Sequence, residues 1–345
     1  MKYFLLFVIL LFFTQAKAQF GGGATYDFLN LTSSARVNAL GGNQVGLIDS
    51  SELSLSFYNP ATLMPGTHNS ISLNYIDYMA DVRYGYASYA RYFEGIGTFS
   101  GGIQYTNYGK FPEALEDGKL TGKTFSASDY ALNLIYSRPV WKNFTGGINL
   151  KPIYSSYEIY SSFGIAVDLG VSFSDSSGNF NAGIVAKNMG VQITTYLSNG
   201  LREPIPFDLQ AGFSQRLAHA PFRFSATLHH LTNWKLTDYS TWNYDHKADN
   251  ELVSGRSDDI VKQFMRHVIL GVEFIPTKNF IVGLGYNFQR RWELGLPDNP
   301  ATSGLSAGFT VKVSKFRVSY AIASYHVSGP SNVFSVSTNL SEFIH

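Results

Sequence analysis

The chain has 345 residues, 26 basic and 25 acidic side chains, and a formal net charge of +1. A near-neutral chain without a basic run has no electrostatic basis for binding nucleic acid. The absence of cysteine excludes disulfide bonds and a lipoprotein anchor.

The first 18 residues have the layout of a secretory signal peptide. Lys2 supplies a positive charge, residues 3–13 form an apolar stretch, and Ala16-Lys17-Ala18 matches a small-x-small cleavage site. The apolar stretch is too short to span a bilayer, which needs about 20 residues. We expect residues 1–18 to be removed, so that the mature chain begins at Gln19.

From about Ser70 onward, apolar and polar residues alternate in segments of about ten residues. In the segment 162–174, for example, Phe163 and Val171 fall on one face of an extended chain and Asp168 falls on the other. This pattern suits a wall with lipid outside and a hydrated lumen inside. It predicts an all-β protein, a transmembrane antiparallel β-barrel of about 14 strands over residues 68–345. The predicted strands are 69–77, 82–92, 97–107, 123–137, 144–156, 162–174, 179–188, 206–217, 222–232, 265–275, 280–290, 303–313, 316–325 and 332–341.

The predicted connections alternate between tight turns and longer links. Every second link is tight, and the others include all the long ones, at 108–122, 189–205, 233–264 and 291–302. Bacterial outer-membrane barrels have short periplasmic turns and longer surface loops. We therefore expect a multi-pass β-barrel in the outer membrane of a Gram-negative bacterium, with both termini in the periplasm.

Alternation also assigns side chains to the two faces of the wall. The expected lipid face is apolar and aromatic, and it includes Phe99, Ile103, Tyr105, Tyr130, Leu132, Leu134, Tyr136, Phe207, Leu209, Phe213, Val282, Leu284, Tyr286, Phe288, Leu305, Phe309 and Val311. The expected lumen face carries both signs of charge, and it includes Gln104, Asn133, Asn149, Lys151, Asp168, Asp208, Gln210, Arg223, Glu273, Lys312 and Arg317. A barrel of this size leaves a channel unless something fills it.

Residues 19–67 precede the first strand and do not alternate. Ser33 or Ser34 is expected to cap a short helix that ends at Gly41 and Gly42. We expect this segment to be a partly helical hatch that plugs the lumen.

Three motifs in the first quarter of the chain carry a resemblance to a known family. They are Tyr-Asp-Phe-Leu-x-Leu at 26–31, Ser-Ala-Arg-x-x-Ala-Leu-Gly-Gly at 34–42 and Phe-Tyr-Asn-Pro-Ala at 57–61. On these residues the chain resembles the FadL-like outer-membrane family and, within it, the PorQ-like barrels of the type IX secretion system. The resemblance implies a hatch inside a barrel of this strand count and a protein that is not an enzyme.

The resemblance also implies partners. The extracellular loops would anchor the surface attachment complex, with a PorZ-like protein bound directly and PorV and the sortase PorU in the wider complex, among outer-membrane lipid and lipopolysaccharide. The alternative is a FadL-like channel for hydrophobic small molecules, which requires an apolar pocket beside a displaceable hatch. An outer-membrane hydrolase is a third hypothesis, but the sequence has no Gly-x-Ser-x-Gly motif.

Several residues are candidates for holding the hatch. A buried charge needs a partner, so we expect Arg36 to pair with Asp168, Asp208 or Glu273 of the lumen face. Gly41 and Gly42 are expected to pack closely against the wall. Asn59 and Pro60 are expected to form a structural turn into the strand region.

Two further features bear on ligands. His229 and His230 are adjacent in a predicted strand and should point to opposite faces, so we expect neither a metal site nor a cofactor. Aromatic residues in a polar surface loop are typical of protein-binding hot spots, which makes 233–264 the candidate partner-binding loop. Its candidate residues are Trp234, Tyr239, Trp242 and Tyr244. The other explanation is an acidic loop that repels its neighbours or contacts lipopolysaccharide.

Overall fold

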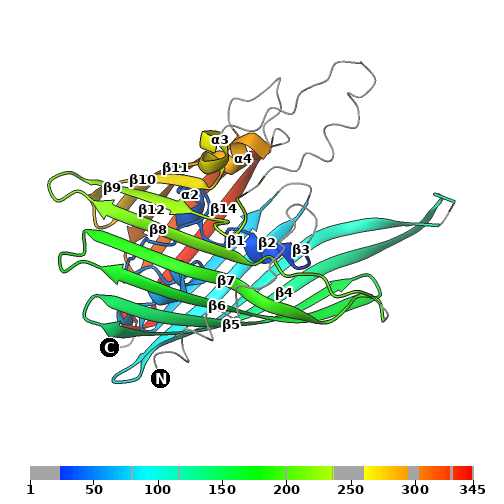
Figure 1. Ribbon diagram of the computed structural model, residues 1–345, viewed down its shortest axis with the longest axis horizontal. Helices are drawn as coiled ribbons and strands as arrows, with labels where there is room; N and C mark the ends of the chain where they lie inside the picture. Colours follow the sequence, from blue (N-terminus) through cyan, green and yellow to red (C-terminus); the bar gives the residue numbers. More distant parts are fainter. Residues whose placement is uncertain are drawn as a thin grey trace, which may run out of the picture.

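The computed structural model describes residues 24–78, 81–115, 117–198, 200–234, 236, 260–293, 303–326 and 329–343. In these residues 14 antiparallel strands form one closed barrel, in which β1 pairs with β14 (Figure 1). The predicted fold class is therefore confirmed. The predicted signal peptide lies outside the described residues. The strands are β1 (Ser70–Asp77), β2 (Arg83–Phe93), β3 (Gly97–Ala114), β4 (Leu120–Trp141), β5 (Phe144–Tyr157), β6 (Tyr160–Ser174), β7 (Phe180–Thr194), β8 (Asp208–Arg216), β9 (Phe222–Leu228), β10 (Val268–Thr277), β11 (Phe280–Asn287), β12 (Leu305–Val313), β13 (Phe316–His326) and β14 (Gly329–Asn339).

The two ends of the barrel differ in their connections. At the end where β1 begins and β14 finishes, tight turns such as 142–143 and 314–315 join the strands; we call it the turn end. The opposite end carries the long connections 195–207, 229–267 and 288–304, and we call it the loop end. The helices α3 (Ile260–Arg266) and α4 (Phe288–Glu293) lie side by side at the loop end (Figure 1).

The differences from the sequence prediction are concentrated at the loop end. Much of the predicted loop 108–122 is strand, because β3 and β4 continue as a hairpin to Ala114 and Leu120. β9 ends at Leu228, before the predicted end of that strand. Phe288 was expected on the lipid face of a strand, but it is the first residue of α4. Phe207 likewise lies just before β8.

Side chains along each strand alternate between the outer face and the lumen face of the wall, as the sequence pattern predicts. On β3, Phe99 and Ile103 are 41% and 46% exposed on the outer face, whereas Ser100 and Gln104 are 5% and 1% exposed toward the lumen. Closure pairs the backbone polar groups of neighbouring strands, which is what a sheet in a bilayer requires. Among the described residues, no helix is both long and apolar enough to cross a membrane.

Residues 24–67, which we call the hatch, lie inside the barrel (Figure 1, blue). Their short helices are η1 (Asp27–Asn30), α2 (Ala35–Ala39), η2 (Leu53–Phe57), η3 (Pro60–Thr62) and η4 (Pro65–Thr67). α2 packs against β11 to β14, and η3 packs against β4 to β6. Leu47, Leu55 and Phe57 form an apolar cluster with Tyr86 of the wall, so hatch and wall side chains together form an apolar core in the lumen.

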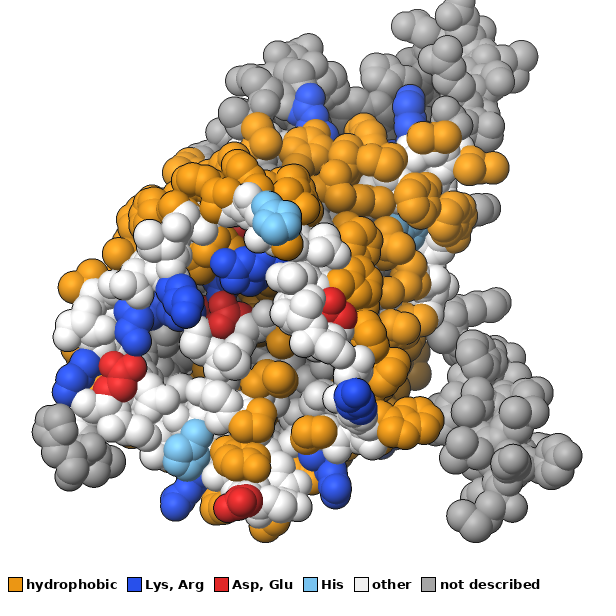
Figure 2. Space-filling model, turned by 90° about the vertical axis from the view of Figure 1, so that its left-hand side faces the viewer, with side chains coloured by type: hydrophobic (Ala, Val, Ile, Leu, Met, Phe, Trp, Pro, Cys, Tyr) orange, Lys and Arg blue, Asp and Glu red, His pale blue; other side chains and the backbone are white. Residues whose placement is uncertain are grey.

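Figure 2 looks onto the turn end. Charged and other polar side chains gather in the middle of this face, and hydrophobic side chains cover the adjoining flank of the molecule. The hydrophobic flank is the outer surface of the barrel, where side chains such as Phe99 and Ile103 are exposed. This distribution is the one that a bilayer around the barrel would select.

Candidate functional site: the hatch and the surrounding wall

Arg36 of α2 joins the hatch to the wall through a buried ion-pair network. Its Nε lies 2.8 Å from Oε1 of Glu273 on β10, and its Nη1 lies 2.7 Å from Oδ2 of Asp49 in the hatch. Arg223 of β9 binds the other Glu273 oxygen at 3.0 Å. The Arg36 and Glu273 side chains are only 3% and 2% exposed. Of the three acids considered from sequence, Glu273 is therefore the one that contacts Arg36.

The network continues toward the turn end. Glu52 of the hatch lies 3.9 Å from Arg36 and 3.6 Å from Arg317 at the start of β13. Burial disfavours the charged form of Asp49, but the positive charge of Arg36, together with hydrogen bonds from Arg36 and Ser51, outweighs it and holds the Asp49 pKa well below its ordinary value. The hatch is thus bound to two separate parts of the wall by ion pairs.

Gly41 and Gly42 follow α2, which ends at Ala39, slightly earlier than predicted. Both have a positive φ, near 96° and 95°, a conformation that favours glycine. The Gly41 amide donates to Ser306 of β12 at 3.0 Å, and the Gly41 carbonyl accepts from Asn287 of β11 at 3.2 Å. The pair therefore brings hatch backbone into direct hydrogen bonding with the wall.

Asn59 and Pro60 form the second close approach of hatch and wall. The Asn59 side chain accepts from the Ala61 amide at 3.0 Å and donates to the Val45 carbonyl at 3.0 Å, while Pro60 begins η3. A methyl group on Gly170 would lie 2.1 Å from the Asn59 side-chain oxygen, and one on Gly147 would lie 2.3 Å from the Pro60 carbonyl carbon. The hatch can reach the wall here only because paired residues of β5 and β6 are glycine.

Asp168, another predicted lumen residue, anchors a separate polar cluster. Its Oδ2 lies 2.6 Å from Nζ of Lys151, and its Oδ1 accepts from the Asn188 amide at 2.7 Å. Lys151 and Lys187 both lie over the ring of Phe57 in the hatch, at 5.9 and 5.3 Å from its centroid. The charges in this part of the lumen are satisfied by the wall and by an aromatic face of the hatch.

His229 and His230 do not behave as adjacent strand residues. Because β9 ends at Leu228 and His230 has a φ of 55°, the chain turns and brings the two rings within 4.6 Å of each other. His230 Nδ1 lies 3.5 Å from Oδ2 of Asp208, another predicted lumen residue. The two histidines therefore do not point to opposite faces as predicted, because the strand that would separate them ends at Leu228.

The remaining predicted site residues fall at the two ends of the barrel. Lys312 lies at the turn end and pairs with Glu342 at 3.1 Å, with both side chains partly exposed. Trp234 lies at the loop end, stacked on His267 and near Phe264 of α3. The other candidate loop residues, Tyr239, Trp242 and Tyr244, lie outside the described residues.

Trp234 belongs to a group of exposed apolar side chains at the loop end, which we call the cap. Ile260 and Val261 of α3 are 75% and 61% exposed, and Phe264, Trp234 and Trp292 are 44%, 49% and 39% exposed. The helices that carry four of these residues were not foreseen from the sequence. These helices, α3 and α4, lie beyond the ends of the short strands β9 to β11 (Figure 1).

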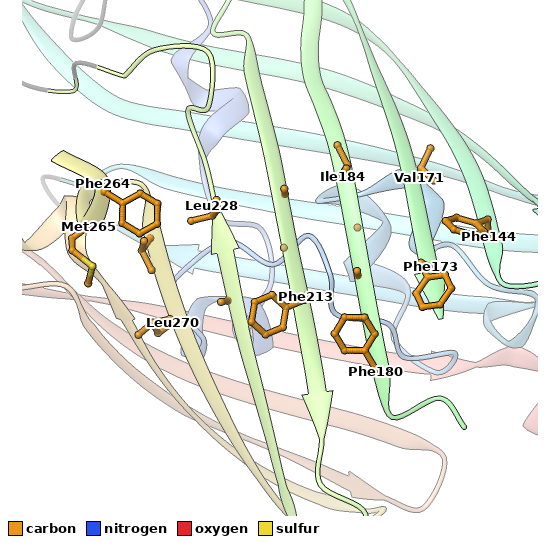
Figure 3. A pocket seen from close by; sticks show the side chains of 16 residues that line it. Phe144, Val171, Phe173, Phe180, Ile184, Phe213, Leu228, Phe264, Met265 and Leu270 are labelled. Atoms are coloured by element: carbon orange, nitrogen blue, oxygen red, sulfur yellow. The ribbon is translucent and has the colours of Figure 1, made fainter. Parts of the chain in front are cut away.

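An apolar hollow of about 780 Å³ lies in the outer surface of the wall between β5 and β10. Small residues such as Ala182, Ala211 and Ala226 line it, and α3 covers part of it with Phe264 and Met265. Figure 3 shows its aromatic and aliphatic lining, which comes from the outward-facing positions of the strands. The hollow is thus open to the surroundings of the barrel and is not the pocket beside the hatch that a channel hypothesis expects.

No protein-family model and no curated protein matches this chain. Solved structures do match. The P. putida toluene transporter TodX shares 14% identity over 90% of this chain and 99% of its own, with a TM-score of 0.52. A deltaS2 mutant of the TodX monoaromatic hydrocarbon channel shares 13% identity over 90% of this chain and 99% of its own, with a TM-score of 0.54. A Pseudomonas aeruginosa FadL homologue shares 10% identity over 89% of this chain and 98% of its own, with a TM-score of 0.48.

At these identities the similarity to TodX shows the fold alone. The fold is a closed 14-strand barrel like that of TodX, and its apolar outer face indicates an outer-membrane location. The names of the two TodX structures describe a channel and a transporter.

Proposed function

We propose that this protein is a non-enzymatic outer-membrane barrel of the type IX secretion system that anchors the surface attachment complex through its loop end. The direct partner would be a PorZ-like protein, with PorV and the sortase PorU in the wider complex. The observation that carries the proposal is the hatch, which buried ion pairs hold to the wall. A plug held in this way suits a barrel whose role is to hold a partner protein at a fixed position on the membrane.

The cap is the surface on which we place the partner. A protein interface needs clustered aromatic and aliphatic side chains at its centre, and Trp234, Phe264 and Trp292 supply them. The turn end would face the periplasm and the loop end the cell surface, as the alternating connection lengths predict. The N-terminal motifs at 26–31, 34–42 and 57–61 support the choice of secretion system.

Affinity capture from detergent-solubilised outer membranes tests the proposal. We expect a PorZ-like protein to copurify in stoichiometric amount and to be lost when Ile260→Asp places a charge in the cap. Ile159→Asp is the matched control, because Ile159 is 81% exposed at the turn between β5 and β6, also at the loop end. Capture of the bare barrel from wild-type membranes, or equal loss in both variants, would contradict the anchor.

A FadL-like channel for hydrophobic small molecules is the second candidate. The similarity to the TodX structures favours it over the anchor. It requires a route through a hatch that is paired to the wall. Uptake of a radiolabelled monoaromatic hydrocarbon or fatty acid by cells with and without the protein is its test. Protein-dependent uptake supports the channel, and identical uptake rules it out.

A further inference from the structure

Three side chains that can bind a metal ion meet in the lumen near the loop end. Asp208 is the first residue of β8, and His229 and His230 follow the last residue of β9. One ligand atom from each residue lies within 4.8 Å of the other two. The three residues also border a polar chamber of about 190 Å³ between the hatch and the wall.

A second observation points to a ligand at this position. His229 is only 4% exposed, and its Nε2 is buried and makes no hydrogen bond with any described residue. A buried ring nitrogen without a partner is unfavourable, and a metal ion would satisfy it. The proposal therefore does not depend on the proximity of three polar groups alone.

The surroundings hold the cluster in place. The Asp208 carboxylate accepts from the His230 amide at 2.6 Å and from the Gln210 side chain at 2.6 Å. The His229 amide donates to the His267 carbonyl at 3.0 Å, which ties the residue to the start of β10. Supporting hydrogen bonds of this kind orient ligands around metal ions.

We propose that Asp208, His229 and His230 bind one divalent transition-metal ion of the class that prefers imidazole, Zn²⁺ or Cu²⁺. Two imidazoles and one carboxylate suit these ions, whereas Ca²⁺ and Mg²⁺ take oxygen ligands. Lys187 and Arg290 border the same chamber and oppose a cation, so strong ligands are needed for binding. Three protein ligands leave a coordination position open toward the chamber.

The geometry requires only small side-chain movements. Three atoms spaced 4.8 Å apart would each be roughly 2.8 Å from a common centre, and zinc ligands lie at about 2.0–2.2 Å. Each ligand atom therefore has to move inward by roughly 0.7 Å, which rotation of the side chains provides. The bound ion would join β8 to the beginning of the long connection between β9 and β10.

Copper binding followed by electron paramagnetic resonance is the test. The protein is purified without a histidine tag, stripped with chelator and titrated with Cu²⁺, and Zn²⁺ is then added as competitor. We expect one Cu²⁺ per barrel with hyperfine coupling to two imidazole nitrogens. His229→Gln should weaken binding at least tenfold and remove one coupling. The control His219→Gln should change neither, because His219 is exposed in the turn between β8 and β9.

A second variant distinguishes the loss of a metal ligand from misfolding of the barrel. His230→Gln alters a side chain that is 17% exposed, and it should also remove one nitrogen coupling while the barrel keeps its folded migration in unheated gels. The proposal is overturned if the wild-type protein binds no Cu²⁺ in the presence of competing chelator. It is equally overturned if both folded histidine variants bind Cu²⁺ as the wild type does.

Discussion

The Glu273→Gln substitution is the sharpest test of how the hatch is held. The change keeps the size of the side chain but removes the charge that binds Nε of Arg36 at 2.8 Å and Nη1 of Arg223 at 3.0 Å. Removing one partner of a buried ion pair costs about 3–5 kcal/mol. Arg36 keeps Asp49 at 2.7 Å, so we expect the lower end of this range, about 3 kcal/mol.

A loss of about 3 kcal/mol corresponds to a factor of about 150 in the population of hatch-open molecules. Hydrogen exchange in detergent micelles measures it. Amides of α2 and η2 should exchange about 100-fold faster in the variant, while those of the barrel strands should not change. Glu342→Gln is the control, because it breaks the exposed pair with Lys312 and should cost no more than about 0.5 kcal/mol. Equal hatch protection in the wild type and Glu273→Gln would refute the reasoning.

Two further predictions concern packing and pH. Gly170→Ala would place a methyl group 2.1 Å from the Asn59 side chain, so it should destabilise hatch docking by about 1–3 kcal/mol. The control Gly101→Ala should be neutral, because a methyl group at Gly101 meets nothing within 4 Å. Unfolding temperatures of the two variants that agree within error would contradict this prediction. The Asp49 pKa is lowered in the folded protein, so its contribution is complete above its ordinary value of 3.8 and is lost as pH falls below that value. Pepsin should therefore leave the hatch intact at pH 4.5 and cleave it at lower pH, and cleavage that already occurs at pH 4.5 would count against the pairing of Asp49 with Arg36.

The barrel could be predicted from the sequence because each strand shows the alternation of apolar and polar residues within its own segment. Because lipid lies outside and the interior is polar, successive residues such as Phe99 and Ser100 differ in polarity. This alternation can be recognised in each segment without knowing which strands pair with it. The loop-end helices α3 and α4 follow no such rule over their seven and six residues. Their apolar residues were interpreted as loop or strand for that reason.

The arrangement of the hatch could be predicted only in part. A buried Arg36 needs an acid, but choosing Glu273 over Asp168 and Asp208 depends on where the hatch places α2 inside the barrel. The wall glycines Gly147 and Gly170 are recognisable as contact points only after the hatch is in place. The meeting of His229 and His230 depends on one positive φ that the strand pattern does not reveal.

The most direct test of the anchor is to lock the hatch. The chain has no cysteine, and a side chain at Gly283 of β11 would place its Cβ 3.1 Å from the Cβ of Ala39, slightly closer than the usual disulfide spacing of about 3.5–4.5 Å. The double variant Ala39→Cys and Gly283→Cys should therefore cross-link on oxidation. We expect oxidised and reduced cells to retain the same amount of a PorZ-like protein at the surface. Loss of surface attachment on oxidation, restored by a reductant, would show that the hatch must move and would contradict the account.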